Sequence, residues 1–231
     1  MKTIGLIGGM SWESSLEYYR IINEETKRRL GGLHSADCLM YSFDFAEIEA
    51  LQMAGAWDEA TVRMIQAAQR LEMGGAACVV ICTNTMHKMA DAVQAAVDIP
   101  LIHIADATAA LIKAQGLATI GLLGTRFTMD ENFYKGRLVE RFGLEVLIPQ
   151  DAARQMVNRV IYEELVLGVL NSDSRAAYVE TIEEMQGRGA QGVILGCTEI
   201  GLLIKPEDSP LPVFDTTYLH ALAAVDFALT P

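Results

Sequence analysis

The sequence repeats itself at about half of its length, and this repeat constrains the fold more than any other feature. The string Ile4–Gly8 returns as Ile120–Gly124, at an offset of 116 residues. Two further strings recur in the same order at offsets of 114 and 112: Gly75–Ile81 as Gly189–Leu195, and Pro100–Ile102 as Pro212–Phe214. The offsets agree with one another and lie close to half of the 231 residues. A duplicated folding unit is therefore predicted.

Each copy is predicted to be an α/β unit. Short apolar runs alternate with amphipathic stretches of helical period; the expected strands are Thr3–Ile7, Leu39–Phe43, Cys78–Cys82 and Leu101–Ile104, and the expected helices are Ser14–Arg29, Asp58–Met73 and Met86–Val97. Near-continuous apolar strands separated by helices indicate a parallel sheet covered on both faces. We expect two similar, doubly wound lobes, residues 1–98 and 99–211, with an active-site cleft between them. Residues from about 212 to 231 could pack back on the first lobe.

Composition narrows the classes of partner and the compartment. The net charge of −12 argues against nucleic acid or an anionic membrane surface as partner, because both reward clusters of Lys and Arg. A local pocket can still bind a small anionic substrate. Four cysteines are too few for a disulfide framework, and no apolar run approaches the roughly 18 residues of a membrane span. We expect a soluble, cytoplasmic protein.

The repeat also pairs residues that can carry chemistry. Ligands of open α/β sheets bind beyond the carboxyl ends of the strands. The offset of 114 aligns Thr83 with Cys197, Asn84 with Thr198, and Thr85 with Glu199, each just after a buried strand. Amide N–H groups at such strand-to-helix turns suit a carboxylate. Two proton-transfer groups on opposite sides of one substrate carbon would form a racemisation site.

No motif in the chain indicates a cofactor or a metal. The sequence has no CxxC, no HExxH, no Walker motif and no spaced GxGxxG, and its histidines show no metal-ligand spacing. The predicted chemistry therefore needs side chains and amide groups alone.

Four motifs spread along the chain carry a resemblance to a known family: Gly8-Gly9-Met10-Ser11-Trp12, Thr83-Asn84-Thr85-Met86-His87, Gly124-Thr125 and Gly196-Cys197-Thr198-Glu199. The chain resembles the aspartate/glutamate racemases of the Asp/Glu/hydantoin racemase superfamily. The resemblance implies two similar lobes, a cleft between them, no pyridoxal phosphate, a cysteine at each wall and a homodimer. It also implies that the substrate is a small amino acid, aspartate or glutamate by default.

The chain departs from that family at the first wall, where the Cys-Asn-Thr pattern reads Thr83-Asn84-Thr85 and a cysteine stands one position earlier, at Cys82. Either residue could be the first proton-transfer group. Side chains alternate between the two faces of a strand, so a shift of one residue should turn Cys82 away from the substrate. The repeat also pairs Cys197 with Thr83. We expect Thr83 and Cys197 to be catalytic, with unequal activity on the two enantiomers because a hydroxyl is a far poorer base than a thiol.

The expected substrate-binding residues lie at the same turns, with one residue added from a helix: Met10, Gln52, Asn84, Thr85, Thr198 and Glu199. Family members that select acidic side chains carry an Arg and a Lys that fall here near Glu47-Ile48 and Val166, none of which is basic. The distal carboxylate could be held by Gln52, Arg126 or Lys88, and a broader specificity stays open.

Other interpretations remain open from the residues alone. Cys197 could be a buried core cysteine, the commoner state of that residue type. Relatives resembling arylmalonate decarboxylases work with one cysteine in the second motif, which this chain also has. A non-catalytic amino-acid-binding protein is the third possibility.

Overall fold

The computed structural model describes residues 1–230 and separates into two compact units. The first unit contains Met1–His103 together with the C-terminal segment that starts at His220, and the second unit contains Ile104–Leu219. The first unit is therefore built from both ends of the chain.

Each unit holds one parallel sheet of four strands. The first sheet contains β1 (Ile4–Gly8), β2 (Cys38–Ser42), β3 (Cys78–Ile81) and β4 (Leu101–Ile102), in the order β2-β1-β3-β4. The second contains β5 (Thr119–Gly124), β6 (Glu145–Leu147), β7 (Val193–Gly196) and β8 (Val213–Asp215), in the order β6-β5-β7-β8. The two orders are the same, and the repeated strings lie on equivalent strands. The predicted fold class, two similar α/β units, is confirmed.

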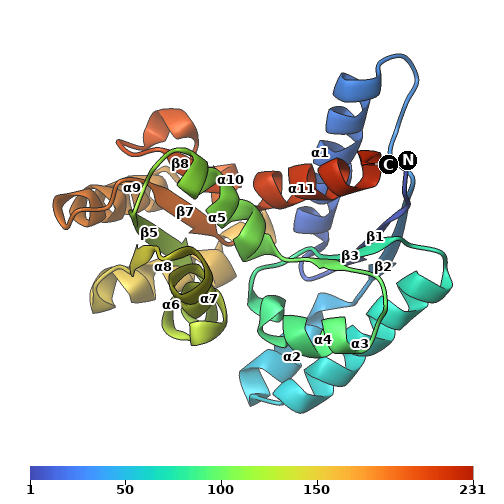
Figure 1. Ribbon diagram of the computed structural model, residues 1–231. Helices are drawn as coiled ribbons and strands as arrows, with labels where there is room; N and C mark the ends of the chain where they lie inside the picture. Colours follow the sequence, from blue (N-terminus) through green and yellow to red (C-terminus); the bar gives the residue numbers. More distant parts are fainter. Residues whose placement is uncertain (231) are drawn as a thin grey trace. The chain divides into compact units, whose positions relative to one another are not determined.

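Helices cover both faces of the first sheet, as Figure 1 shows. They are α1 (Trp12–Leu30), α2 (Phe45–Ala54), α3 (Trp57–Met73), the 3-10 helix η1 (Thr85–Met89), α4 (Ala90–Ala95) and α11 (Thr216–Leu229). Ile4, Leu6 and Val80 point to one face and pack against α1 and α11. Ile7 and Ile81 point to the other face, against α3 and its neighbours. The alternation along each strand therefore fills two apolar layers.

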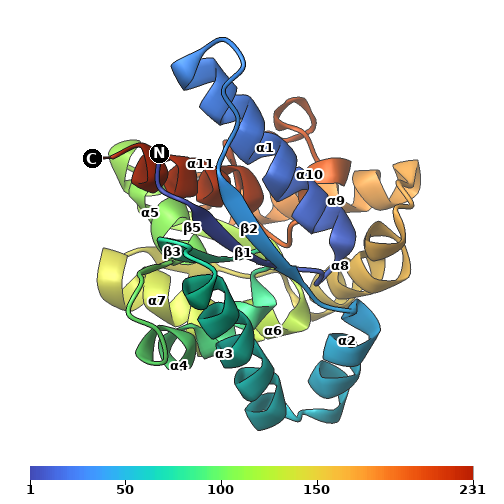
Figure 2. The same cartoon turned by 90° about the vertical axis from the view of Figure 1, so that its right-hand side faces the viewer.

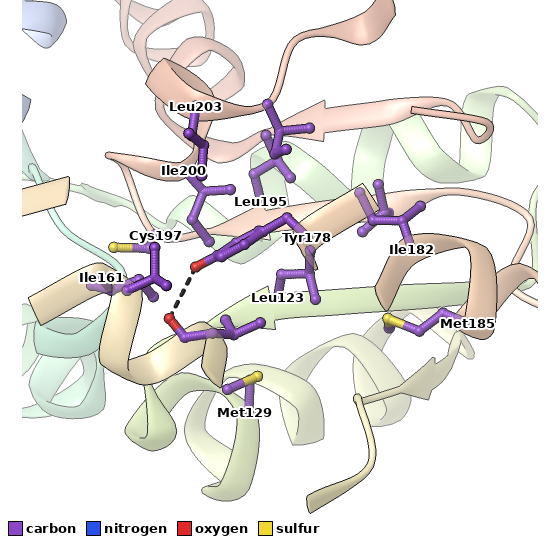
Figure 3. Packing of buried hydrophobic residues seen from close by; sticks show 14 of the residues in the cluster. Leu123, Met129, Ile161, Tyr178, Ile182, Met185, Leu195, Cys197, Ile200 and Leu203 are labelled. Carbon is purple, nitrogen blue, oxygen red and sulfur yellow. Dashed lines mark hydrogen bonds between the residues drawn. The ribbon is translucent and has the colours of Figure 1, made fainter. Parts of the chain in front are cut away.

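The second sheet is covered in the same way, by α5 (Ile104–Ala114), α6 (Arg126–Asp130), α7 (Asn132–Phe142), α8 (Asp151–Glu163), η2 (Leu165–Leu167), α9 (Ser172–Gly187), α10 (Ile200–Leu203) and η3 (Pro206–Asp208). α5 and α7 pack on one face. α8, α9 and α10 form the other layer, shown in Figure 3. There Tyr178 is fully buried, and its hydroxyl donates to the carbonyl oxygen of Val157 at 2.9 Å.

Two expected boundaries differ from the structure. The helix expected over Met86–Val97 is divided into η1 and α4, because the chain leaves β3 in a tighter 3-10 turn. The segment from about residue 212 is also divided: β8 pairs with β7 in the second sheet, and the chain joins the first unit from His220. There α11 runs beside α1 near the N-terminus (Figure 2), and the amide of Lys2 donates to the carbonyl of Ala228 at 2.8 Å.

A buried carboxylate on α1 contributes pH-dependent stability to the first unit. The side chain of Glu25 is 7% exposed and accepts hydrogen bonds from Arg28 and Arg29, and Arg29 also pairs with Asp226 on α11. The Arg28 hydrogen bond is the largest cause that lowers the pKa of Glu25, from its ordinary 4.5 to about 2, against the opposing effect of burial. The unfolded chain therefore binds more protons than the folded chain between those pH values.

We expect Glu25→Gln to lower the free energy of unfolding by about 1–2 kcal/mol at pH 7, discounted because Arg28 is largely exposed. The stabilisation is complete above pH 4.5 and is lost as the pH falls toward 2. Urea unfolding at pH 7 and at pH 3 measures the difference. Glu24→Gln is the control, since Glu24 pairs with Arg20 in solvent and should contribute almost nothing. A difference between Glu25→Gln and the unaltered chain that does not change with pH would contradict this assignment.

Candidate active-site residues

The first group of candidate residues lies where β1 and β3 end side by side in the first unit. Ile7 on β1 is in register with Ile81 on β3, so the turns that follow both strands lie at the same edge of the sheet. Gly9 has φ +78°, and a Cβ there would lie 2.2 Å from the carbonyl oxygen of Phe43, so no other residue fits. Met10 follows Gly9 and is buried, and Ser11 caps α1 by accepting from the amide of Ser14. The glycine turn therefore holds Met10 at the edge where Thr83 lies.

Thr83 and Cys82 lie in different environments. Cys82 is fully buried and packs with Leu6, Tyr18 and Val80 in the apolar layer below α1 and α11. Burial raises the pKa of the Cys82 thiol. Thr83 is 9% exposed, and it is the first residue after β3 that does not belong to that apolar layer. A thiol packed in a core is a poor proton carrier, whereas Thr83 lies at the edge where ligands of such sheets bind.

The other candidates of the first unit have defined contacts. Asn84, Thr85 and Gln52 are buried, and the Gln52 amide nitrogen lies 3.1 Å from the sulfur of Met86. Lys88 places its ammonium 4.1 Å from the centre of the Trp57 ring, a cation–π contact. Gln52 therefore contacts η1, the 3-10 helix that follows Thr83.

The second group of candidate residues lies at the end of β7 in the second unit. The Cys197 sulfur donates to Oε2 of Glu199 at 3.0 Å, and the Thr198 hydroxyl donates to the same oxygen at 2.6 Å. Cys197 is 9% exposed and Glu199 is 3% exposed. Burial, and then the charge of Glu199, raise the pKa of the Cys197 thiol well above its usual range. Figure 3 shows Cys197 at the border of the apolar layer that contains Tyr178 and Ile200.

This arrangement can carry a proton in either direction. With its pKa raised, the Cys197 thiol is protonated at rest and can act as an acid. The Glu199 oxygen is within hydrogen-bond distance and can take the thiol proton, which leaves a thiolate that can act as a base. The sequence predicts Glu199 as a substrate-binding residue, and the structure adds its hydrogen bond with the Cys197 thiol.

Replacing Glu199 tests its two proposed effects, which are to raise the pKa of the Cys197 thiol and to accept the thiol proton. We expect Glu199→Gln to lower the thiol pKa, because the neighbouring negative charge is removed, and to lower turnover by about 10²-fold, because no carboxylate then takes the proton. The pH dependence of alkylation of Cys197 measures the pKa, and steady-state rates measure turnover. Thr198→Val, which removes the other donor to the same oxygen and keeps the charge, is the matched control. An unchanged alkylation profile would contradict the assignment.

The two positions near which the Arg and Lys of the resembled family fall have other partners here, and one of the basic candidates, Arg126, lies beside a cavity. Glu47 pairs with Arg63 at 2.5 Å, and Val166 packs against the apolar layer of the second unit. Arg126 follows Thr125 at the end of β5 and, with Arg154 and Asp130, lines a cavity of about 340 Å³ in the second unit. Of the basic candidates, Arg126 therefore has space beside it for a small anion.

Sequence reasoning missed the threonines at the end of β8. Thr216 and Thr217 are buried, and the Thr216 hydroxyl donates to the carbonyl of Leu195 on β7 at 2.8 Å. Because β7 and β8 are neighbours, these residues lie at the same edge as Cys197. The offset of 112 pairs them with the apolar Ile104-Ala105, so the repeat gave no polar signal here.

Comparison with known proteins decides the family. Residues 7–224 match the family described as Asp/Glu/Hydantoin racemase. The chain belongs to the Asp/Glu/hydantoin racemase family. Across residues 1–230, no helix is long and apolar enough to cross a membrane, and no group of three or more His, Cys, Asp or Glu could hold a metal ion.

Three proteins described as racemases or racemase homologues are similar to this chain along most of its length. A putative Asp/Glu racemase from Yersinia pestis is 56% identical, with full coverage of both chains and a TM-score of 0.94. An aspartate racemase homologue from Pyrococcus horikoshii OT3 is 36% identical, with full coverage and a TM-score of 0.87. The broad specificity amino-acid racemase RacX of Bacillus subtilis is 26% identical over 73% of this chain and 72% of its own length. These relatives support an amino-acid racemase activity.

Proposed function

We propose that the chain is a cofactor-independent racemase that interconverts L- and D-aspartate or glutamate by transferring a proton at the alpha carbon. Thr83 and Cys197 are the two proton-transfer groups. The observation that carries the proposal is the Cys197 thiol hydrogen-bonded to Glu199 at the end of a buried strand, in a chain of the Asp/Glu/hydantoin racemase family. The equivalence of Thr83 and Cys197 in the internal repeat supports the assignment of the second group.

The proton is conserved through the proposed reaction. The Cys197 thiol first gives its proton to Glu199 and then, as thiolate, removes the proton from the alpha carbon of one enantiomer. Amide N–H groups at the two strand-to-helix turns stabilise the resulting carbanion, as helix N-termini do for anions. The Thr83 hydroxyl returns a proton to the opposite face. The Thr83 oxygen then regains a proton from solvent and Glu199 releases its proton to solvent, which restores the resting state. In the reverse direction Thr83 would have to act as a base, so that direction is slower.

The substrate side chain sets the remaining specificity. Met10, Gln52, Asn84, Thr85, Thr198 and Glu199 are the proposed substrate-binding residues, and all are buried at or beside the two turns. Arg126 is the proposed partner of the distal carboxylate. The Bacillus subtilis relative is named a broad specificity racemase, which supports including neutral amino acids among the substrates tested.

Isotope exchange in heavy water tests the proposal. The enzyme is incubated with L- and D-aspartate, L- and D-glutamate and neutral amino acids, and deuterium at the alpha carbon and the enantiomer ratio are followed. A racemase incorporates deuterium and inverts. Loss of carbon dioxide from an arylmalonate, with no exchange into amino acids, would instead indicate a single-cysteine decarboxylase. Binding without exchange would indicate a binding protein, and either result overturns the proposal.

We also propose a cytoplasmic homodimer. All four cysteines are free thiols, which suits a reducing compartment. Trp12, Leu16 and Tyr19 form one stripe of α1 and are 65%, 54% and 49% exposed, and an exposed apolar stripe is a feature of protein–protein contact surfaces. Sedimentation at several concentrations tests the dimer, and a monomer at every concentration contradicts it.

A further inference from the structure

The main-chain carbonyl of Thr83 is hydrogen-bonded to the side chain of His87, whereas a carbonyl at the start of a helix is usually bound by a main-chain amide. The chain leaves β3 in the 3-10 helix η1, so the amide of His87 donates to the carbonyl of Asn84 at 3.0 Å. The Thr83 carbonyl lies 2.7 Å from Nδ1 of the His87 ring. A carbonyl oxygen can only accept, so Nδ1 of His87 carries the hydrogen. The imidazole thus takes the place that an i+4 amide would have in an α-helix.

The equivalent carbonyl in the second unit is bound differently. The Cys197 carbonyl accepts from the amide of Ile200 at 3.1 Å, which is a main-chain bond. The offset of 114 places Gly201 where the first unit has His87, and the offset of 112 places Asp215 where it has His103. These equivalent pairs are in contact in both units: the two imidazole rings lie 4.6 Å apart, and a Cβ on Gly201 would lie 2.5 Å from Asp215. Of these two equivalent positions, only the one in the first unit, His87, carries an imidazole.

The His87 ring is held by two further buried rings. His103 and His220 lie 4.6 and 5.5 Å from it, edge to face. His220 on α11 is fixed by Tyr18 from α1, at 2.7 Å, and by the carbonyl of Ile102, at 2.6 Å. Burial lowers the pKa of His220 to about 4, so its ring is neutral at neutral pH. The C-terminal helix therefore holds His87 in place without adding a charge beside it.

We propose that His87 is a positioning residue for Thr83, with His220 and His103 holding its ring. The inference rests on the proposed racemase function, in which the Thr83 hydroxyl returns a proton to the alpha carbon. By binding the Thr83 carbonyl oxygen, His87 fixes the peptide plane between Thr83 and Asn84. That plane contains the Thr83 Cα, from which the side chain and its hydroxyl project. A hydroxyl is a weaker proton carrier than a thiol, so its contribution depends strongly on placement, and a shift of about 1 Å can cost about 10²-fold in rate.

The test compares His87→Leu with His87→Asn in the full chain. Deuterium exchange at the alpha carbon without inversion needs only Cys197, whereas inversion also needs Thr83. We expect His87→Leu to lower kcat for inversion by about 10- to 100-fold, with KM and the exchange rate of the enantiomer deprotonated by Cys197 nearly unchanged. In His87→Asn, the amide nitrogen takes the position of Nδ1, so inversion should largely recover.

Ile22→Ala is the matched control, because it removes a buried side chain from the layer that α1 and α11 share in the same unit. We expect it to lower the melting temperature and leave the ratio of inversion to exchange as in the unaltered enzyme. Equal loss of inversion and exchange in His87→Leu would overturn the inference and show a merely structural role, as would a failure of His87→Asn to recover inversion. If the unaltered enzyme neither exchanges nor inverts any amino acid, the proposed function itself is wrong.

Discussion

Cys197→Ser should lower both alpha-carbon exchange and racemisation of aspartate by at least about 10³-fold, because the serine hydroxyl cannot form the anion that the thiol forms beside Glu199. From the enantiomer that Cys197 deprotonates, exchange and inversion fall together, since both begin with the removal of that proton. Deuterium incorporation and enantiomer ratio in heavy water, measured on the same samples, give the two rates.

Cys82→Ala is the control for that variant. Cys82 is packed in the layer below α1 and α11, so its loss should lower stability by about 1 kcal/mol and leave turnover within about two-fold. Thermal unfolding of both variants separates lost stability from lost chemistry. If Cys82→Ala lost activity as completely as Cys197→Ser, Cys82 and not Thr83 would be the first proton-transfer group.

The second large effect concerns the unequal rates proposed for the two directions of the reaction. Thr83→Cys should raise the rate from the disfavoured enantiomer by at least about 10-fold and bring the two directions toward equal rates, because a thiol replaces a hydroxyl as base. Initial rates from each pure enantiomer measure the ratio. Thr83→Val, which keeps the branched shape and removes the hydroxyl, should abolish inversion and retain exchange by Cys197. Loss of all activity in Thr83→Cys, together with loss in Cys82→Ala, would contradict the register assigned to β3.

Much of the fold could be predicted because its signals are local. The strands β1, β3, β5 and β7 are continuous apolar strings, and their repetition indicated two units before any tertiary contact was known. The break between η1 and α4 could not be predicted, since it depends on which groups bind the carbonyls after β3. The division of α11 between the units also depends on long-range packing, because the contacts of His220 are with Tyr18 and Ile102, far away in sequence.

Part of the candidate site could also be predicted from the sequence, and part depends on side-chain contacts. The pairing of Thr83 with Cys197 follows from offsets in the sequence, as does the grouping of Asn84 and Thr198 with them. The contact between Cys197 and Glu199, and the one between His87 and the Thr83 carbonyl, are set by side-chain rotamers in a buried turn. Sequence patterns identify which turns matter, but they do not fix which atoms meet inside them.

The first unit is closed by a helix that arrives only after the second unit is complete. In the full chain, Ala221, Ala224 and Val225 of α11 cover apolar residues of the first unit. A fragment ending at His103 would lack α11 and would leave those apolar residues exposed to water. Since Lys2 and Ala228 are hydrogen-bonded, a short linker could join the first and last segments of this sequence. A circular permutant that begins at Ile104 would then encode each unit as nearly one uninterrupted stretch of gene.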